Sequence, residues 1–135
     1  MLFGSIVVFG CLVLVYSIQL PEELQEYADD LHNICIQKSG ITEADYAAYD
    51  IKNNPHDVKI QCYMSCLMLE SKWMTPIGAI QYDYILENAH PEIKDLLEAA
   101  INKCRKVEDD SDLCKKASNF NSCMYEADPE NWFLV

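Results

Sequence analysis

The chain has 135 residues, enough for one domain, and half of its residues are apolar, which excludes a disordered chain. Its 22 acidic and 10 basic residues give a formal net charge of −12 at pH 7. A surface of this charge repels phosphate groups, so the composition argues against binding to nucleic acid and against docking on anionic lipid.

An apolar segment opens the sequence and runs from Leu2 to Tyr16. It is shorter than the roughly 20 residues that a transmembrane helix needs, and Val15 and Ser17 stand at the −3 and −1 positions of a signal-peptidase site. We interpret residues 1–17 as a secretory signal peptide, with a membrane anchor as the less favoured alternative. The expected mature domain, residues 18–135, keeps six of the seven cysteines, because Cys11 lies in the signal. An even number of cysteines in a small secreted chain predicts a disulfide framework.

The spacing of apolar residues predicts an all-α fold of about six short helices. Proline, glycine and capping residues mark their ends, and no segment alternates with the period of two that a strand requires. Gly40 is expected to end the first helix, and Thr42 to cap the second. The expected helices cover about residues 21–39, 43–50, 55–70, 75–88, 91–104 and 113–126.

Two cysteines of the third expected helix, Cys62 and Cys66, lie four positions apart in an apolar run. Residues at this spacing share one helix face, with Cβ atoms roughly 5–6 Å apart, whereas a disulfide requires roughly 3.5–4.5 Å. The two cysteines are therefore poor partners for each other and are expected to attach two other segments to the same helix face. Roughly a dozen pairings of the six cysteines satisfy this condition, and spacing alone does not choose among them.

The last four residues, 132–135, are all apolar, which is unusual at a chain end. If these residues were exposed they would form a hydrophobic surface patch, so we expect them to fold back against an apolar interior. Two interpretations fit equally well, plain core packing and a lid over a ligand pocket.

Motifs for catalysis are missing from the sequence. There is no GxSxG, no HExxH and no glycine-rich phosphate loop, and none of the histidines, His32, His56 and His90, adjoins a nucleophile motif. Six cysteines in an oxidising compartment are more often paired than bound to zinc. We therefore expect no enzyme, no cofactor and no metal site.

The six cysteines are separated by 26, 3, 37, 9 and 8 residues. Other recognisable strings are Pro-Glu-Glu-Leu at 21–24, Leu31-His32-Asn33-Ile34-Cys35, Cys62-Tyr63-Met64-Ser65-Cys66-Leu67, and Asp128-Pro129 followed by Phe133-Leu134-Val135. In these features the chain resembles the insect odorant-binding proteins, in particular the antennal subgroup of mosquitoes and flies. The resemblance covers residues 20–135.

This resemblance implies a shell of six helices around an apolar cavity that binds small hydrophobic molecules, such as odorants or pheromones, and carries them through aqueous secretion. It implies the disulfides Cys35–Cys66, Cys62–Cys114 and Cys104–Cys123. The positions that it implies for ligand contact are Leu97, Ala100, Ile101, Met124, Trp132 and Phe133. Apolarity alone suggests a core role for Met68, Trp73 and Phe120.

In the subgroup the terminal carboxylate docks on a histidine and a tyrosine, which correspond here to His32 and Tyr63, with Val135 as the last residue. Protonation of His32 beside a carboxylate would strengthen this clasp. Release of ligand at acid pH would therefore need another group, for example His90 if it is buried in the neutral form.

Three alternative functions stay open at this stage. The first is a scavenger of the same fold in saliva, venom or the reproductive tract. The second is an interaction protein whose apolar tail docks on a partner chain or receptor, and the third, disfavoured by the missing motifs, is a secreted hydrolase. For the carrier we expect a small apolar ligand, possible recognition by an odorant receptor, and a monomer or weak homodimer, with no membrane insertion.

Overall fold

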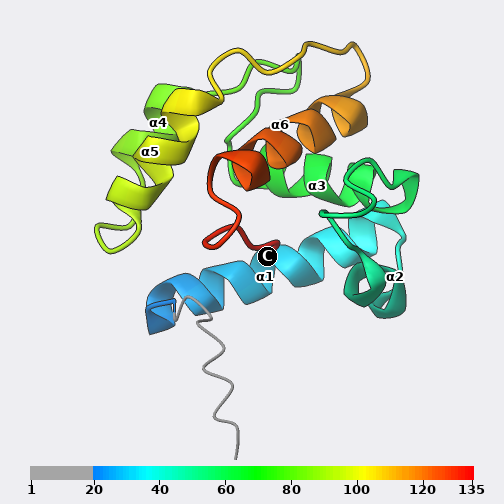
Figure 1. Ribbon diagram of the computed structural model, residues 1–135. Coiled ribbons are helices and arrows are strands. Elements are labelled where there is room, and N and C mark those ends of the chain that lie inside the picture. Colours follow the sequence, from blue (N-terminus) through cyan, green and yellow to red (C-terminus); the bar gives the residue numbers. More distant parts are fainter. Residues whose placement is uncertain (1–19) are drawn as a thin grey trace, which may run out of the picture.

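A computed structural model describes residues 20–135 of the chain, and within them it contains six α-helices and no strand (Figure 1). The helices are α1 (Glu22–Ser39), α2 (Glu43–Ala48), α3 (Val58–Glu70), α4 (Tyr82–Glu87), α5 (Lys94–Lys103) and α6 (Leu113–Ala127). The predicted all-α fold is confirmed. The proposed signal peptide and the first residues of the expected domain lie outside the described residues.

Local sequence explains where most of these helices begin and end. Gly40 ends α1 with a left-handed φ of 74°, and its N–H donates to the carbonyl of Ile36. Thr42 and Asp45 form a reciprocal capping box at the start of α2. Asp112 caps α6 by accepting hydrogen bonds from the N–H groups of Cys114 and Lys115. The last residue of the acidic loop is therefore the N-cap of this helix.

The prediction of a helix from residue 75 is wrong, because residues 75–81 form a turn. The N–H of Thr75 donates to the carbonyl of Ala79 at 2.8 Å, and Met74 pairs with Ile80 in an isolated antiparallel bridge. Gly78 is buried with a φ of 89°, a left-handed conformation that a helix cannot contain. Ile77 is 91% exposed, so the apolar spacing in this segment does not mark a helix face.

The centre of the fold is α3, which packs on both α6 and α1. In Figure 1 it lies between these two helices, with α5 against α6 and α4 against α5. The buried side chains of α3 include Ile60, Tyr63, Met64 and Met68, and Phe120 of α6 is buried with them. A single apolar core therefore connects the helices on either side of α3.

Three disulfides reinforce this arrangement. Cys35–Cys66 joins α1 to α3, Cys62–Cys114 joins α3 to α6, and Cys104–Cys123 joins the end of α5 to α6. Cys62 and Cys66 thus attach two different helices to α3, as their spacing predicts. The pairs are those that the family resemblance implies.

After α6 the chain reverses direction at Asp128, whose carbonyl accepts the N–H groups of Asn131 and Trp132. The C-terminal segment, residues 131–135, then runs back to α1 (Figure 1). This return places the last residues beside helices that lie about a hundred positions earlier in the sequence.

The two left-handed glycines give a first test of this fold. Replacing Gly40 by alanine should lower the free energy of unfolding by about 1–2 kcal/mol, because only the backbone strain is added and nothing lies within 4 Å of a Cβ there. Gly78→Ala should cost about 1 kcal/mol more, because its Cβ would lie 2.8 Å from Leu113 Cδ2. Chemical denaturation measures both values, and a Gly78→Ala variant as stable as Gly40→Ala would contradict the turn geometry.

Candidate ligand-binding site

An apolar cavity of about 230 Å³ lies among the helices and the C-terminal segment. The residues that line the cavity come from four helices and from the C-terminal segment, so the site exists only in the folded chain. The lining side chains include Leu24, Ala28 and Leu31 of α1, Met64, Leu67 and Met68 of α3, Leu97 of α5, Phe120 and Met124 of α6, and Trp132, Phe133, Leu134 and Val135 of the tail.

Few polar groups reach this inner cavity. Ser71 donates its hydroxyl to the carbonyl of Met68, and Asn121 donates its amide to the carbonyl of Ala117. Asn131 donates to the carboxylate of Asp128. These three donors already have partners within the protein, and most of the remaining lining is apolar, so the cavity offers a ligand mainly apolar surface.

Four of the six positions expected to contact ligand line the inner cavity: Leu97, Met124, Trp132 and Phe133. Ala100 instead lines a neighbouring cavity of about 80 Å³, which it shares with those four residues. Ile101 is completely buried and lines neither cavity, so its position is that of a core residue.

The contributions of α1 and α3 to the cavity are absent from the expected set. Leu24, Ala28 and Leu31 follow helical spacing, but the same spacing describes any buried helix face. Met68 and Phe120, expected as core residues, are almost fully buried and also line the cavity. Sequence periodicity marks an inward face without showing whether that face meets protein or an open space.

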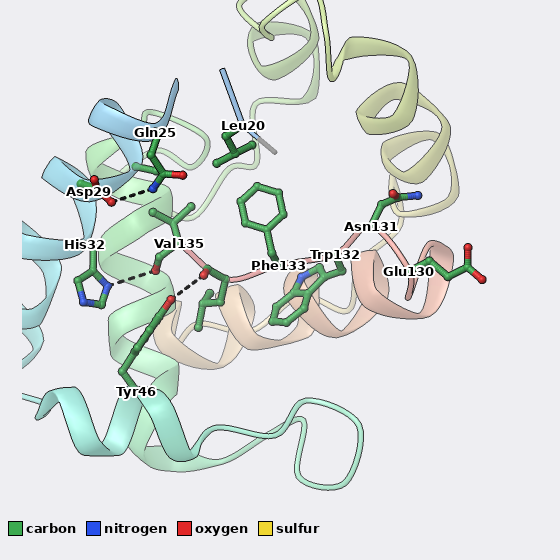
Figure 2. A pocket seen from close by; sticks show the side chains of 12 residues that line it. Leu20, Gln25, Asp29, His32, Tyr46, Glu130, Asn131, Trp132, Phe133 and Val135 are labelled. Atoms are coloured by element: carbon green, nitrogen blue, oxygen red, sulfur yellow. Dashed lines mark hydrogen bonds between the residues drawn. The ribbon is translucent and has the colours of Figure 1, made fainter. Parts of the chain in front are cut away.

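The end of the C-terminal segment is held by side chains from three helices. Tyr63 of α3 donates its hydroxyl to the main-chain oxygen of Val135, and Tyr46 of α2 donates to the carbonyl of Leu134 at 2.7 Å. His32 of α1 lies with Nδ1 2.6 Å from the Tyr63 hydroxyl and 3.5 Å from the Val135 oxygen. Figure 2 shows His32 and Tyr46 close together at the end of the tail. The structure therefore brings together the three residues expected to form the clasp.

The sequence did not single out two further residues of this cluster, Tyr46 and Glu43. The rings of His32, Tyr46 and Tyr63 pack edge to face, with centroids 4.4 to 5.7 Å apart. His32 Nε2 lies 2.9 Å from both carboxylate oxygens of Glu43. Helical spacing within one element does not reveal these contacts, because they join separate helices.

Tyr63 is completely buried, and burial raises the pKa of its phenol above the ordinary value, with smaller contributions in the same direction from Tyr46 and Glu43. At neutral pH the hydroxyl is therefore protonated and serves as a donor to the Val135 oxygen. This supplies the donor that the half-buried oxygen of Val135 needs.

A second and larger pocket, of about 400 Å³, also borders the tail (Figure 2). Polar side chains line much of it, among them Gln25, Asp29 and Glu130. Both pockets are lined by residues 131–135, so the tail borders a pocket of mixed lining as well as the apolar cavity. The smaller inner cavity is the better candidate for an apolar ligand.

Within the described part of the chain, no three metal-binding side chains gather in one place. None of the six helices is long and apolar enough to cross a membrane.

Replacing Tyr63 by phenylalanine should lower the free energy of unfolding at pH 7 by about 1–3 kcal/mol, because the half-buried oxygen of Val135 loses its donor. Since the folded state raises the pKa of Tyr63, its contribution is fully present below about pH 10 and is lost as the pH rises through the folded value. The difference between wild type and variant should therefore shrink above pH 10. Chemical denaturation from pH 7 to pH 11 measures it, and a difference that grows with pH would contradict this.

Residues 18–127 match the PBP/GOBP family. General odorant-binding protein 19d of Drosophila melanogaster is 24% identical over 108 residues, which cover 76% of this chain and 72% of the relative. Odorant binding protein 5 of Apis mellifera has a similar structure, with a TM-score of 0.74 and 24% identity over 87% of this chain and 98% of that one. Odorant Binding Protein 7 of Anopheles gambiae, solved with four disulfide bridges and an azo compound, gives a TM-score of 0.64 at 23% identity over 83% and 91% of the two chains. The chain belongs to the PBP/GOBP family of insect odorant-binding proteins.

Proposed function

We propose that the protein is a secreted carrier that binds small hydrophobic ligands in the inner cavity and transports them through aqueous fluid. The observation that carries this proposal is the apolar cavity of about 230 Å³ with the C-terminal segment in its wall. Membership of a family of non-enzymatic odorant-binding proteins supports it. A relative of the same fold was solved in complex with a small azo compound, which supports the choice of ligand class.

The size of the cavity limits the ligand. Its volume of about 230 Å³ lies below the roughly 300–1,000 Å³ of sites for drug-sized molecules. Binding would be driven by apolar area removed from water, worth roughly 25 cal/mol per Å², less the cost of immobilising the ligand. We therefore expect ligands of the size of small odorants, with at most one polar group, to bind best.

The C-terminal segment serves in this proposal as the lid of the cavity. In a chain that ends at Val135, the oxygen bound by Tyr63 belongs to the terminal carboxylate. A carboxylate removed from water needs donors, and the hydroxyl of Tyr63 together with His32 supplies them. We infer that the clasp of His32, Tyr63 and Val135 holds the lid closed over a bound ligand.

Filling the cavity should weaken ligand binding. Leu97→Trp places an indole in the ligand space and should displace the equivalent of about two ligand methylenes, worth about 1.6 kcal/mol or about tenfold in affinity. Leu96→Trp is the matched control, because Leu96 is 45% exposed on the same helix and does not line the inner cavity. Titration of the oxidised protein with a fluorescent apolar probe measures both. Equal affinities in the two variants would place the ligand elsewhere, and no probe binding in folded wild type would refute the carrier function.

Deleting residues 132–135 separates a lid from a docking segment. Because these residues line the cavity, their loss should raise the dissociation rate of the probe about tenfold or more while the helical core stays folded, as circular dichroism can verify. An interaction protein that uses its tail only to dock a partner would keep its probe kinetics unchanged. That result would favour the interaction protein over the carrier.

A further inference from the structure

We propose that the pocket of about 400 Å³ beside α1, which we call the mixed pocket, is a second binding site and takes a small organic cation, namely a protonated amine with an apolar body. The inner cavity and the mixed pocket differ in size, polarity and charge. The contacts behind the proposal do not depend on whether the inner cavity carries an apolar ligand.

One face of α1 and the C-terminal segment form the mixed pocket. Its residues on α1 are Gln25, Ala28, Asp29 and His32, which share one helix face by their spacing. Figure 2 shows the labelled side chains of α1 on one side of the view and those of residues 130–133 on the other. The volume of about 400 Å³ lies within the roughly 300–1,000 Å³ typical of ligand sites.

The carboxylates of the mixed pocket make it attractive to a cation. Asp29 and Glu130 line the pocket, and among the described residues no lysine or arginine does. Neither carboxylate takes part in an ion pair within the described part of the chain. The net charge of −12 adds to the negative potential at this site.

Asp29 has an oxygen available for an ammonium group. Its Oδ1 accepts a hydrogen bond from Gln25 Nε2 at 2.9 Å, and this is the one hydrogen bond of its side chain within residues 20–135. Oδ2 can therefore accept from a ligand. An N–H donor with a positive charge makes a stronger hydrogen bond to a carboxylate than a neutral donor does.

His32 does not compete with this role. Its Nε2 lies 2.9 Å from each carboxylate oxygen of Glu43, and its Nδ1 lies 2.6 Å from the hydroxyl of Tyr63. Both ring nitrogens thus have partners, and the carboxylate of Glu43 balances any charge on the ring. Asp29 and Glu130 therefore set the sign of the charge in the pocket.

Aromatic rings supply the second half of the recognition. Tyr46, Trp132 and Phe133 line the pocket, and Phe133 is 43% exposed, so part of its ring is open to a ligand. A cation near an aromatic face is attracted by the ring, and an apolar body packs against such rings. Carboxylate and rings together suit a molecule that has both a positive charge and an apolar part.

Other ligand classes fit this lining less well. A neutral apolar molecule would remove water from Asp29 without replacing its hydrogen bonds. A carboxylic acid would bring a like charge close to Asp29 and Glu130. A bare metal ion lacks a ligand set, because no three metal-binding side chains gather in the part of the chain that the structure describes.

The test is an NMR titration of the oxidised protein at pH 7 with three compounds of similar shape, 2-phenylethylamine, 2-phenylethanol and phenylacetate. The amine is protonated at this pH, as lysine is. It should bind about threefold or more tightly than the alcohol and about tenfold more tightly than the acid. Raising the salt concentration from about 0.02 to about 0.5 M should reduce this preference, because both carboxylates are exposed to solvent.

Asp29→Asn keeps the shape of the side chain and removes its charge. This variant should weaken binding of the amine about three- to fivefold and leave binding of the alcohol unchanged. Asp30→Asn is the matched control, because Asp30 is the next residue of α1, is also exposed and does not line the pocket. Glu130→Gln should act in the same direction as Asp29→Asn.

The NMR signals also locate the ligand. The side-chain amide of Gln25, which lines the mixed pocket and not the inner cavity, should shift with the amine, whereas the methyl group of Met68, which lines the inner cavity and not the mixed pocket, should not. Equal affinities for the three compounds would overturn the proposal. So would equal binding of the amine by Asp29→Asn and Asp30→Asn, or shifts at Met68 without shifts at Gln25.

The two sites can fail separately. Leu97→Trp, which should weaken the apolar probe, should leave binding of 2-phenylethylamine unchanged, because Leu97 does not line the mixed pocket. A protein that binds the amine as described and no apolar probe would refute the carrier function and support this inference. Normal probe binding without amine binding at Gln25 would overturn the inference alone.

Discussion

Two disulfides that leave α3 four residues apart are the constraint on which the rest of the structure depends. Cys66 fixes α1 and Cys62 fixes α6, so the helices on either side of α3 are held without filling all the space between them. An empty cavity of 230 Å³ would cost about 5.5 kcal/mol at about 24 cal/mol per Å³. Three disulfides at about 2–4 kcal/mol each are of a size to offset that cost. The cross-links thus allow a small domain to keep an internal space.

The C-terminal segment completes the shell and at the same time separates two environments. Its side chains Trp132 and Phe133 meet the apolar cavity, while its last oxygens meet the polar cluster of His32, Tyr46 and Tyr63. The free energy that holds the segment therefore has an apolar part, which depends on what the cavity contains, and a polar part, which comes from the hydrogen bonds of Tyr46 and Tyr63 to the last two residues. A ligand in the cavity would touch the same short segment that these hydrogen bonds hold.

The position of the histidines bears on how such a carrier responds to pH. His90 is half-buried, and its Nδ1 accepts the N–H of Glu92, so it is not the fully buried neutral histidine that release at acid pH would require. His56 lies on the other side of the core, 2.9 Å from the hydroxyl of Ser118. His32 is the one histidine among the described residues that touches the tail.

By itself the sequence determined the helical class, the caps at Gly40 and Thr42, and the use of Cys62 and Cys66 for two different partners, because each of these follows from local geometry within a few residues. The prediction of a helix over residues 75–81 was wrong, because the left-handed Gly78 places a turn there in spite of the apolar spacing. Only the tertiary structure decided that Met68 and Phe120 line the cavity whereas Ile101 is packed in the core. The sequence pattern of a buried helix face is the same whether that face lines a cavity or packs on other side chains. It also brought Glu43 to His32 and Tyr46 to Leu134, contacts between side chains whose meeting depends on how separate helices pack.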